Sequence, residues 1–387
     1  MKDNKKILIF SLAYHPFVGG AEVAVKKITD RLGDDFQFEM ITANLDGRQK
    51  EEEEIGKIKI YRTSLFSPPY EGGGLGEVKK IINKYLFPWL AYKKAIALQK
   101  GNNYNLIWAM MANQAGWAAL KFKKKFSTVK YLLTLQEGDS EWDIWLRTFF
   151  IRPIYKSIYR QADYIQAISN FLAERAKNMG AKCPIEVVPN GVKSQKSKVK
   201  SQNFNSKFKI ITVSRLVIKN GIEDLIKSIK LLITSYQLPV ILTIIGDGKL
   251  CGELERLAED LKIRDKINFV GVIQNEEVYK HLIEANIFVR PSLSEGLGNA
   301  FLEAMSVGVP VIGTSVGGIP DFLKEGKTGW FCEVKNPKSI AEKINYILAE
   351  KNQEEVKGVV ENARKMVEEK YNWDKIVIQM KNIFSKL

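Results

Sequence analysis

Cysteine and histidine are scarce in this chain of 387 residues. The three cysteines, Cys183, Cys251 and Cys332, lie far apart, are odd in number and lack the spacing of a metal site. Reduced thiols in a cytosolic protein are therefore the simplest interpretation. The two histidines are His15 and His281, and His281 falls within a helical pattern where a structural role is the simplest reading.

Long apolar runs are also missing. The chain has no window of about 18 uninterrupted apolar residues, so we expect no transmembrane helix. The apolar run near the N-terminus, Ile7 to Leu12, is too short for a membrane span or a signal peptide and predicts a first strand.

Acidic residues are few in the first half of the chain. Residues 1–200 contain 33 Lys and Arg against 20 Asp and Glu, so this half carries +13 of the total net charge of +15. The asymmetry indicates an anionic partner or substrate for the first half. We expect no nucleic acid partner, because no recognition motif accompanies the charge. The anionic cytoplasmic face of a membrane is one alternative, and a merely solubilising surface is the other.

Short apolar runs alternate with helical patterns along most of the chain, which predicts an α/β protein with parallel sheets. Its length favours two domains. Residues 193–207 are almost all polar and make the best linker. We therefore predict a domain over 1–192, a linker over 193–207, a second domain over 208–370, and a last segment, 371–387, whose helix packs back on the first domain. Both domains read as doubly wound and Rossmann-like, facing each other across a cleft.

The most informative segment is 291–305, Pro-Ser-Leu-Ser-Glu-Gly-Leu-Gly-Asn-Ala-Phe-Leu-Glu-Ala-Met, which follows a predicted strand. It predicts a turn that leads into a helix, with Glu295 in the turn and Glu303 about one turn into the helix. The helix N-terminus between them offers an anion site. Carboxylates suit hydroxyl groups better than phosphate. A phosphate flanked by sugars fits the two carboxylates and the anion site between them.

Other loops follow predicted strands in the same way. Arg215 and Lys219 follow the strand 209–213 and could neutralise a pyrophosphate, or form a surface ion pair. Val272 follows the strand 267–270, where backbone could contact a base. Gly19-Gly20 follows the first strand, where the chain can approach a ligand closely or simply turn. The dinucleotide fingerprint G-x-G-x-x-G is absent there.

Together these motifs resemble a retaining glycosyltransferase of the GT-B fold, of the group 1 or family 4 type. The signature Pro-Ser-x-x-Glu-Gly-x-Gly-x-x-x-x-Glu-Ala-Met spans 291–305, and Gly-Gly-Ile-Pro at 317–320 and Gly-Lys-Thr-Gly at 326–329 continue it. Pro-Asn-Gly-Val at 189–192 and Gly-Gly-Ala-Glu at 19–22 also match. The resemblance covers nearly the whole chain.

The resemblance implies a role for each motif. Glu303 would bind the ribose hydroxyls of a nucleotide-sugar donor, and Glu295 the hydroxyls of the transferred sugar. Arg215 and the following lysine would stabilise the departing nucleotide diphosphate, and Gly20 would close on the donor from the other domain. The phosphates would be held by the backbone of Gly296, Leu297, Gly298, Asn299 and Ala300. No metal or other cofactor is expected, and the leaving phosphate would take the acceptor's proton.

Two positions depart from the family pattern. The family lysine directly precedes the glycine matched by Gly221, but Asn220 stands there and Lys219 lies one residue earlier. Gln136 occupies a position where many members have a histidine. A glutamine can hydrogen-bond a sugar but cannot titrate, so Gln136 is a candidate acceptor or sugar contact.

Residues 142–160 alternate aromatics with Arg and Lys and contain one acidic residue, Asp143. They predict a helix that either lies at a bilayer interface or packs on the core with a basic outer face. Residues 70–77 read as a loop that could close on an acceptor. A lipid-linked acceptor is thus one hypothesis, with the enzyme cytoplasmic and peripheral on the inner face of the membrane.

We therefore predict a hexosyltransferase that moves a hexose, with retention, from a nucleotide-diphospho-sugar to a saccharide or lipid-linked acceptor, in cell-surface polysaccharide or glycolipid synthesis. The alternatives are a nucleotide-sugar epimerase of the same architecture and a catalytically silent glycosyltransferase-like partner protein. The pair Glu295 and Glu303 argues against the silent protein. The sequence leaves the nucleotide, the sugar and the acceptor open.

Overall fold

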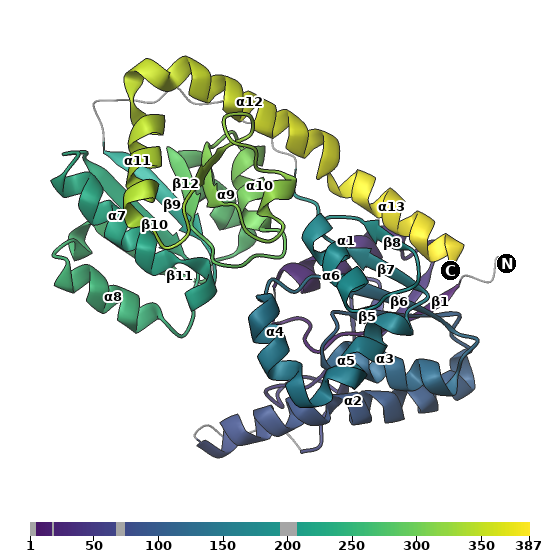
Figure 1. Ribbon diagram of the computed structural model, residues 1–387. Coiled ribbons are helices and arrows are strands. Elements are labelled where there is room, and N and C mark those ends of the chain that lie inside the picture. Colours follow the sequence, from purple (N-terminus) through teal and green to yellow (C-terminus); the bar gives the residue numbers. More distant parts are fainter. Residues whose placement is uncertain (1–4, 18, 67–73, 194–206) are drawn as a thin grey trace. The chain divides into compact units, whose positions relative to one another are not determined.

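The computed structural model describes residues 5–17, 19–66, 74–193 and 207–387, and it divides into two compact units (Figure 1). The first unit contains Met1–Glu137, Glu141–Asn190 and Asp374–Leu387, and the second contains Gly138–Ser140 and Gly191–Trp373. Within the predicted linker, residues 194–206 lie outside the described residues.

The first unit is built on an eight-stranded sheet of order β3-β4-β2-β1-β5-β6-β7-β8. Its neighbours are parallel except that β3 runs antiparallel to β4 at the edge. The central strands are near-continuous apolar runs, as expected where helices cover both faces. The strands are β1 (Lys6–Phe10), β2 (Gln37–Ala43), β3 (Glu52–Ile55), β4 (Ile58–Thr63), β5 (Leu106–Met110), β6 (Lys130–Leu135), β7 (Tyr164–Ala167) and β8 (Ile185–Val187).

The helices of this unit include one contributed by the far end of the chain. Phe384 in the last helix is fully buried, and its ring lies 5.1 Å from that of Trp108, 5.5 Å from Phe36 and 5.9 Å from Phe38. The helices are α1 (Gly20–Leu32), α2 (Gly74–Asn102), α3 (Gln114–Lys125), α4 (Glu141–Thr148), η1 (Phe149–Ile151), α5 (Arg152–Arg160), α6 (Asn170–Asn178) and α13 (Trp373–Lys386).

Two predictions for this unit need correction. Residues 142–160 do not form one helix, because α4 ends and η1 separates it from α5. Pro153 lies in the first turn of α5, where its missing N–H is tolerated, whereas inside a continuous helix it would break the hydrogen-bonding pattern. Of the loop predicted at 70–77, residues 70–73 lie outside the described residues and 74–77 belong to α2.

The second unit contains a six-stranded, fully parallel sheet of order β11-β10-β9-β12-β13-β14. Its core joins apolar residues of the central strands to the inner faces of α7 and α11, among them Ile210, Ile229 and Ile344. The strands are β9 (Phe208–Val213), β10 (Val240–Ile245), β11 (Ile267–Gly271), β12 (Ile287–Arg290), β13 (Val311–Thr314) and β14 (Trp330–Cys332).

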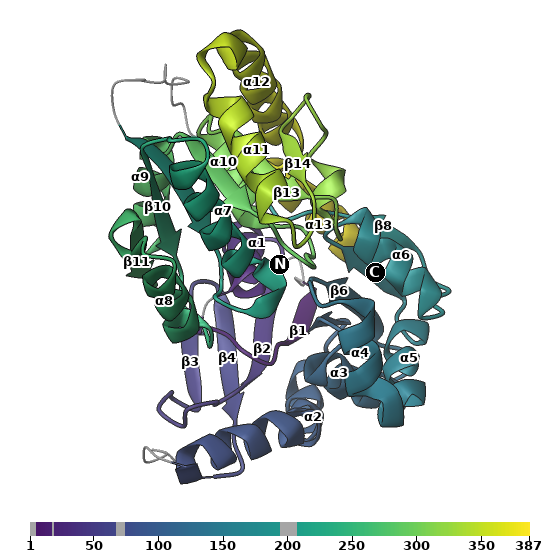
Figure 2. The same ribbon diagram turned by 60° about the vertical axis from the view of Figure 1, so that its left-hand side comes forward.

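Helices cover both faces of this sheet, as in a doubly wound fold (Figure 2). Helices α7, α8 and α11 form one layer, and α9 and α10 pack together on the other side. The helices are η2 (Ile218–Asn220), α7 (Ile222–Thr234), α8 (Cys251–Asp260), η3 (Arg264–Lys266), α9 (Asn275–Glu284), α10 (Asn299–Ser306), η4 (Ile319–Asp321), α11 (Pro337–Leu348), η5 (Glu350–Asn352) and α12 (Gln353–Lys370).

Candidate active site

The connections of the second sheet reverse direction between β9 and β12. From β9 the chain continues to β10 on one side, and from β12 it continues to β13 on the other, while β9 and β12 are paired to each other. In open parallel sheets, ligands bind beyond the carboxyl ends of two such neighbouring strands. Arg215 and Lys219 follow β9, and Glu295 follows β12, so the loops with the predicted residues meet at this point.

The two loops are held together by backbone contacts. The N–H of Leu293 donates to the carbonyl of Lys219 at 2.7 Å. Gly221 has a left-handed φ of 66°, and a Cβ there would lie 2.0 Å from the carbonyl oxygen of Pro291. Only glycine fits this position, which explains why the loop after β9 has a glycine at residue 221.

The loop after β12 ends at the N-terminus of α10. Gly298 precedes the helix with a φ of 93°. The N–H groups in the first turn of a helix have no partners within the helix, and they carry the positive end of its dipole. Residues 296–300, predicted to hold the phosphates, thus form one continuous segment that leads into this helix end.

The Gly-Gly-Ile-Pro segment supports this loop. The N–H of Gly318 donates to the carbonyl of Glu295 at 3.1 Å. Gly317 has a φ of 55°, and a Cβ at this residue would lie 1.8 Å from the same carbonyl oxygen. The motif therefore fixes the position of the backbone at Glu295.

Arg290, the last residue of β12, was not among the predicted site residues. Its guanidinium forms an ion pair with the carboxylate of Glu295, and both side chains are largely buried, at 10% and 14% exposed. Glu295 Oε1 also accepts from the N–H of Gly296 at 3.0 Å. The signal in the sequence was a lone arginine that ends an otherwise apolar strand, Ile287 to Arg290.

Glu303 lies on α10 and is half-buried. Loss of hydration on burial raises its pKa to about 7, and the nearby Arg290 opposes the rise. Arg290 has its own pKa lowered to about 10, first by burial and then by Arg215, while Glu303 acts in the opposite direction. Arg215, Arg290, Glu295 and Glu303 therefore form one electrostatic cluster at the β9–β12 edge.

The predicted cations differ in exposure. Arg215 is exposed, whereas Lys219 is partly buried, and its Nζ donates to Asp139 at 2.9 Å, a residue of the Gly138–Ser140 segment that groups with this unit. Asn220, at the family's lysine position, is buried, and its Nδ2 donates to the carbonyl of Arg215 at 2.6 Å. Asn220 therefore secures the loop that carries Arg215, and it offers no charge to a ligand.

Val272 lies further along the same edge, directly after β11, and is 78% exposed. The N–H of Gly246, after β10, donates to the carbonyl of Gly271 at 2.8 Å. Gly246 has a φ of 126°, and a Cβ there would meet the carbonyl oxygen of Ser214 at 2.0 Å. The turns after β9, β10 and β11 are thus packed against each other, and Val272 extends from their outer end.

Two predicted residues belong to the first unit. Gly20 is the first residue of α1, where the side chain of Glu22 accepts from the N–H of Gly19 at 2.8 Å. Gln136 follows β6, and its Oε1 accepts from Asn190 Nδ2 at 3.1 Å. Beside Gln136, Glu137 accepts from the N–H of Ala112, and burial raises the pKa of Glu137.

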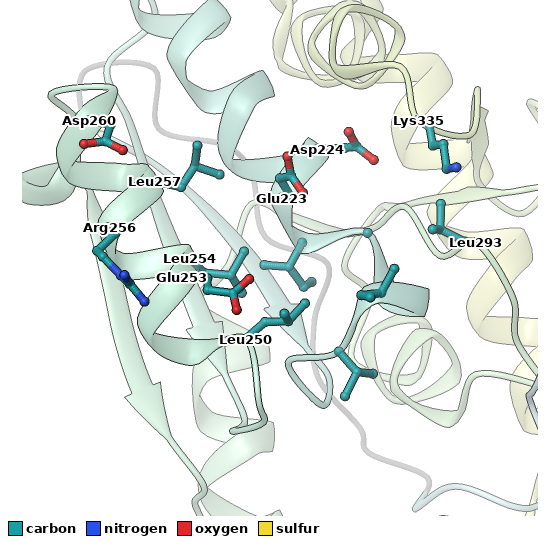
Figure 3. A pocket seen from close by; sticks show the side chains of 14 residues that line it. Glu223, Asp224, Leu250, Glu253, Leu254, Arg256, Leu257, Asp260, Leu293 and Lys335 are labelled. Carbon is teal, nitrogen blue, oxygen red and sulfur yellow. The ribbon is translucent and has the colours of Figure 1, made fainter.

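A cavity of about 760 Å³ borders the other side of the loop after β9, between α7 and α8 (Figure 3). Its floor is apolar, with Leu250, Leu254 and Leu257 among the lining residues. Its rim carries four carboxylates, of Glu223, Asp224, Glu253 and Asp260, against the cations Arg256 and Lys335. This excess of negative charge repels phosphate, so the cavity does not suit the diphosphate of a donor. In the described parts of the chain, no cluster of three or more His, Cys, Asp or Glu could hold a metal ion.

Comparison with known proteins gives the family of this chain. The model of "Glycosyl transferases group 1" matches residues 193–366, and that of "Glycosyltransferase Family 4" matches residues 18–196. The uncharacterized glycosyltransferase MJ1069 of Methanocaldococcus jannaschii is 26% identical over 99% of this chain and 98% of its own. A putative colanic acid biosynthesis glycosyltransferase, WcaL of Escherichia coli, is 28% identical over 61% of this chain and 59% of its own.

Solved structures show the same fold over almost the whole chain. A sucrose-phosphate synthase from Thermosynechococcus elongatus superimposes with a TM-score of 0.81 at 20% identity, over 99% of both chains. Anabaena Alr3699/HepE, in complex with UDP and glucose, gives a TM-score of 0.75 at 17% identity, over 99% of this chain and 100% of that one.

The two units have the GT-B fold, with a Rossmann-like sheet in each unit. The two family models together extend from residue 18 to residue 366. The chain therefore belongs to the group 1 glycosyltransferases. The fold class, the family and the enzyme class predicted from the sequence are confirmed.

Proposed function

We propose that this glycosyltransferase moves a hexose from a nucleotide-diphospho-sugar to a saccharide or lipid-linked acceptor, with retention of the anomeric configuration. The observation that carries the proposal is the pairing of two carboxylates, Glu295 and Glu303, with Arg290 around the N-terminus of α10. The two carboxylates can accept hydrogen bonds from hydroxyl groups, and an anion site lies between them. This arrangement matches a diphosphate that has ribose at one end and a hexose at the other.

In this proposal Glu303 accepts hydrogen bonds from the ribose hydroxyls, and Glu295 from hydroxyls of the hexose. One Glu295 oxygen is held by Arg290 and the other by the N–H of Gly296. Each carboxylate oxygen has more than one lone pair, so Glu295 can still accept from the sugar. Because both its oxygens are fixed, Glu295 positions the hexose and does not act as a nucleophile.

The leaving diphosphate gains negative charge as its bond to the anomeric carbon breaks. Arg215, Lys219 and the N–H groups at the start of α10 offset that charge, which lowers the barrier most if they are fixed in advance. The acceptor hydroxyl attacks the anomeric carbon from the face that the phosphate leaves. Its proton passes to the departing phosphate oxygen, so the step requires no protein nucleophile and no metal.

Val272 and the turn backbone beside it are the residues that we propose to contact the base, and a contact made by backbone suits more than one nucleotide. The binding of UDP by the structurally similar Alr3699/HepE supports testing UDP first. The similarity to the colanic acid enzyme supports a role in cell-surface polysaccharide or glycolipid synthesis. Among the described residues no helix is both long and apolar enough to cross a bilayer. We propose a cytoplasmic enzyme with peripheral contact to an anionic membrane.

Thermal-shift measurements with UDP, GDP and ADP test the donor site, because a ligand that binds the native state raises its apparent stability. One nucleotide should stabilise the wild type, and Glu303→Ala should weaken that binding about tenfold to a hundredfold, since it removes hydrogen bonds to a charged acceptor. Glu255→Ala, on α8 beside an exposed arginine, is the matched control and should bind normally. Unchanged nucleotide binding by Glu303→Ala would refute the assignment of the ribose site.

Product analysis separates transfer from epimerisation. With a labelled donor and a mixture of lipid and saccharide acceptors, the label should appear in the acceptor, and its anomeric configuration by NMR should equal that of the donor. Label that stays on the nucleotide with an altered sugar configuration would identify an epimerase.

A further inference from the structure

An exposed apolar stripe runs along the first half of α2 in the first unit. Val78, Ile81, Ile82, Tyr85 and Trp89 recur at helical spacing, and each is between 36% and 66% exposed. The buried positions of the same turns are on the opposite side, at Asn83, Phe87 and Ala91. The helix therefore has two apolar faces, and only one of them packs on the sheet.

A second exposed apolar group lies on α4, η1 and the start of α5. Phe150 is 94% exposed, the highest value among the large apolar side chains described. The rings of Trp142, Trp145, Phe149 and Phe150 follow one another with centroids 5.1 to 5.3 Å apart. Trp145 is half-buried, and the other exposed members are Leu146, Ile151 and Ile154.

The two groups belong to one helical layer. Helix α3 packs against both α2 and α5, and α5 contacts α4. Figures 1 and 2 both show α2, α3, α4 and α5 gathered on one side of the first unit. Lys121 of α3 lies 3.3 Å above the ring of Trp89, so a cation of the middle helix reaches the stripe of α2. We call the two exposed groups together the aromatic surface.

The charge around the aromatic surface is mostly positive. Helix α2 contains six lysines and one acidic residue, Glu77. Residues 141–160 contain four Lys and Arg with two acidic residues, Asp143 and Glu141, and Glu141 is paired with Arg175. So many exposed apolar side chains on one helical layer, with basic residues among them, are unusual on a monomeric protein and mark an interaction site. Trp, Tyr and Phe next to Lys and Arg are typical of a surface that enters the headgroup region of a bilayer.

We propose that the aromatic surface is the membrane-docking surface of this protein and that its partner is a bilayer rich in anionic lipid. The apolar side chains enter the boundary between headgroups and acyl chains, and the flanking lysines and arginines contact lipid phosphates. This inference deepens the proposed function, because it names the surface that would bring a lipid-linked acceptor to the enzyme. It rests on the exposed residues of the first unit and not on the donor site.

Vesicle flotation with the full-length chain tests the proposal. The protein should float with vesicles of phosphatidylcholine and phosphatidylglycerol, less with phosphatidylcholine alone, and less as salt rises. Phe150→Glu and Tyr85→Glu should each weaken partition into the vesicles by at least about tenfold. Each removes one apolar side chain that enters the bilayer and adds a charge that anionic lipid repels. Ile378→Glu on α13 and Val334→Glu in the second unit, both exposed apolar positions outside the aromatic surface, should float as the wild type does.

Three results would overturn the proposal. One is a wild-type protein that does not float with anionic vesicles, and another is normal flotation of both Phe150→Glu and Tyr85→Glu. The third is a wild-type dimer that Phe150→Glu converts to a monomer with no effect on flotation, which would assign the surface to a second copy of the chain. Nucleotide stabilisation measured on the same variants keeps the two proposals apart, because docking variants should bind the nucleotide as well as the wild type does.

Discussion

Arg290 forms an ion pair with Glu295 and also lies close enough to Glu303 to affect its pKa. One buried guanidinium thus interacts with both carboxylates, which lie on either side of the N-terminus of α10. The arrangement holds Glu295 in one orientation, and it reduces the cost of placing the charge of Glu303 in the same partly buried site. Arg290, Glu295 and Glu303 therefore form a group of three interacting charges. The sequence signature contains only the two acids.

Arg290→Met should lower the free energy of unfolding by about 3–5 kcal/mol, because it leaves Glu295 buried without its cation. Donor binding should weaken as well, since the carboxylate loses its fixed orientation. Urea denaturation and nucleotide titration measure the two effects. Arg264→Met, which removes an exposed arginine paired with Glu255, is the control and should change neither by much. An Arg290→Met protein as stable as the wild type would contradict the role of the ion pair.

The pKa of Glu303, raised by burial to about 7, predicts that nucleotide affinity rises with pH as the pH passes through that value. Only the ionised carboxylate has all its lone pairs available to the ribose hydroxyls. Isothermal titration at a series of pH values measures the affinity, and Glu303→Gln should remove the step. A pH-independent affinity in the wild type would be inconsistent with this prediction.

The same residue predicts the pH dependence of stability without ligand. Because the folded-state pKa lies above the ordinary value of 4.5, the native state holds this proton more tightly than the unfolded state does. The stabilisation is complete below the ordinary value, and it is lost as the pH rises to about 7. Urea denaturation should show this loss in the wild type, and a smaller one in Glu303→Gln.

Lys219 and Asn220 should differ in what they contribute. Lys219→Met should lower the turnover number about a hundredfold or more while the protein stays folded, because it removes a fixed charge near the leaving diphosphate. Asn220→Ala should instead cost about 1–3 kcal/mol of unfolding free energy, because its buried amide holds the carbonyl of Arg215. Lys227→Met, on the exposed side of α7, serves as the control for charge. Full activity of Lys219→Met would mean that Arg215 acts alone.

Gly317→Ala should destabilise the protein by more than about 1–2 kcal/mol, because residue 317 has a left-handed φ and a Cβ there would strike the carbonyl of Glu295. The displaced loop should also bind nucleotide more weakly. Gly252→Ala is the matched control, since a Cβ at this helical residue meets nothing within 4 Å and alanine favours a helix. Thermal unfolding compares the two, and equal melting temperatures would disprove the steric argument.

Phe384→Ala should cost about 3–5 kcal/mol, because it leaves a cavity between Trp108, Phe36 and Phe38 in the core of the first unit. Ile378→Ala, at a position of the same helix that is 59% exposed, should cost little. Limited proteolysis of the Phe384→Ala protein should cut the first unit before the second. If the second unit is cut first, α13 does not stabilise the first unit in this way.

The parallel sheets could be predicted because their strands are short apolar runs between turns. Residues 209–213 and 267–270 were predicted as strands, and these bounds lie within one residue of those of β9 and β11. The strand β3 was missed, because Glu52–Ile55 is mostly acidic and lies at an exposed edge, where no hydrophobic pattern is required. The helix α2 was missed because one of its apolar faces is exposed, which weakens the helical periodicity of the sequence.

The candidate site was predictable where a motif names both residue and spacing, as for Glu295 and Glu303. Arg290 could not be found in that way, because its role depends on which strand ends beside which loop. The function of Asn220 was likewise invisible, since a buried amide bonded to a main-chain carbonyl leaves no sequence pattern. Arg290 and Asn220 thus lie outside the motif's assigned residues, and both hold such residues in place.

The position of α13 has a consequence for how the chain folds during synthesis. Residues 374–387 complete the core of the first unit, yet they follow the entire second unit in the sequence. A ribosome releases the sheet of the first unit long before the helix that covers Trp108 exists. Part of the core of the first unit therefore stays exposed to solvent until these residues are synthesised. The second unit can fold without them. Chaperone binding to the growing chain should end only once Phe384 has emerged.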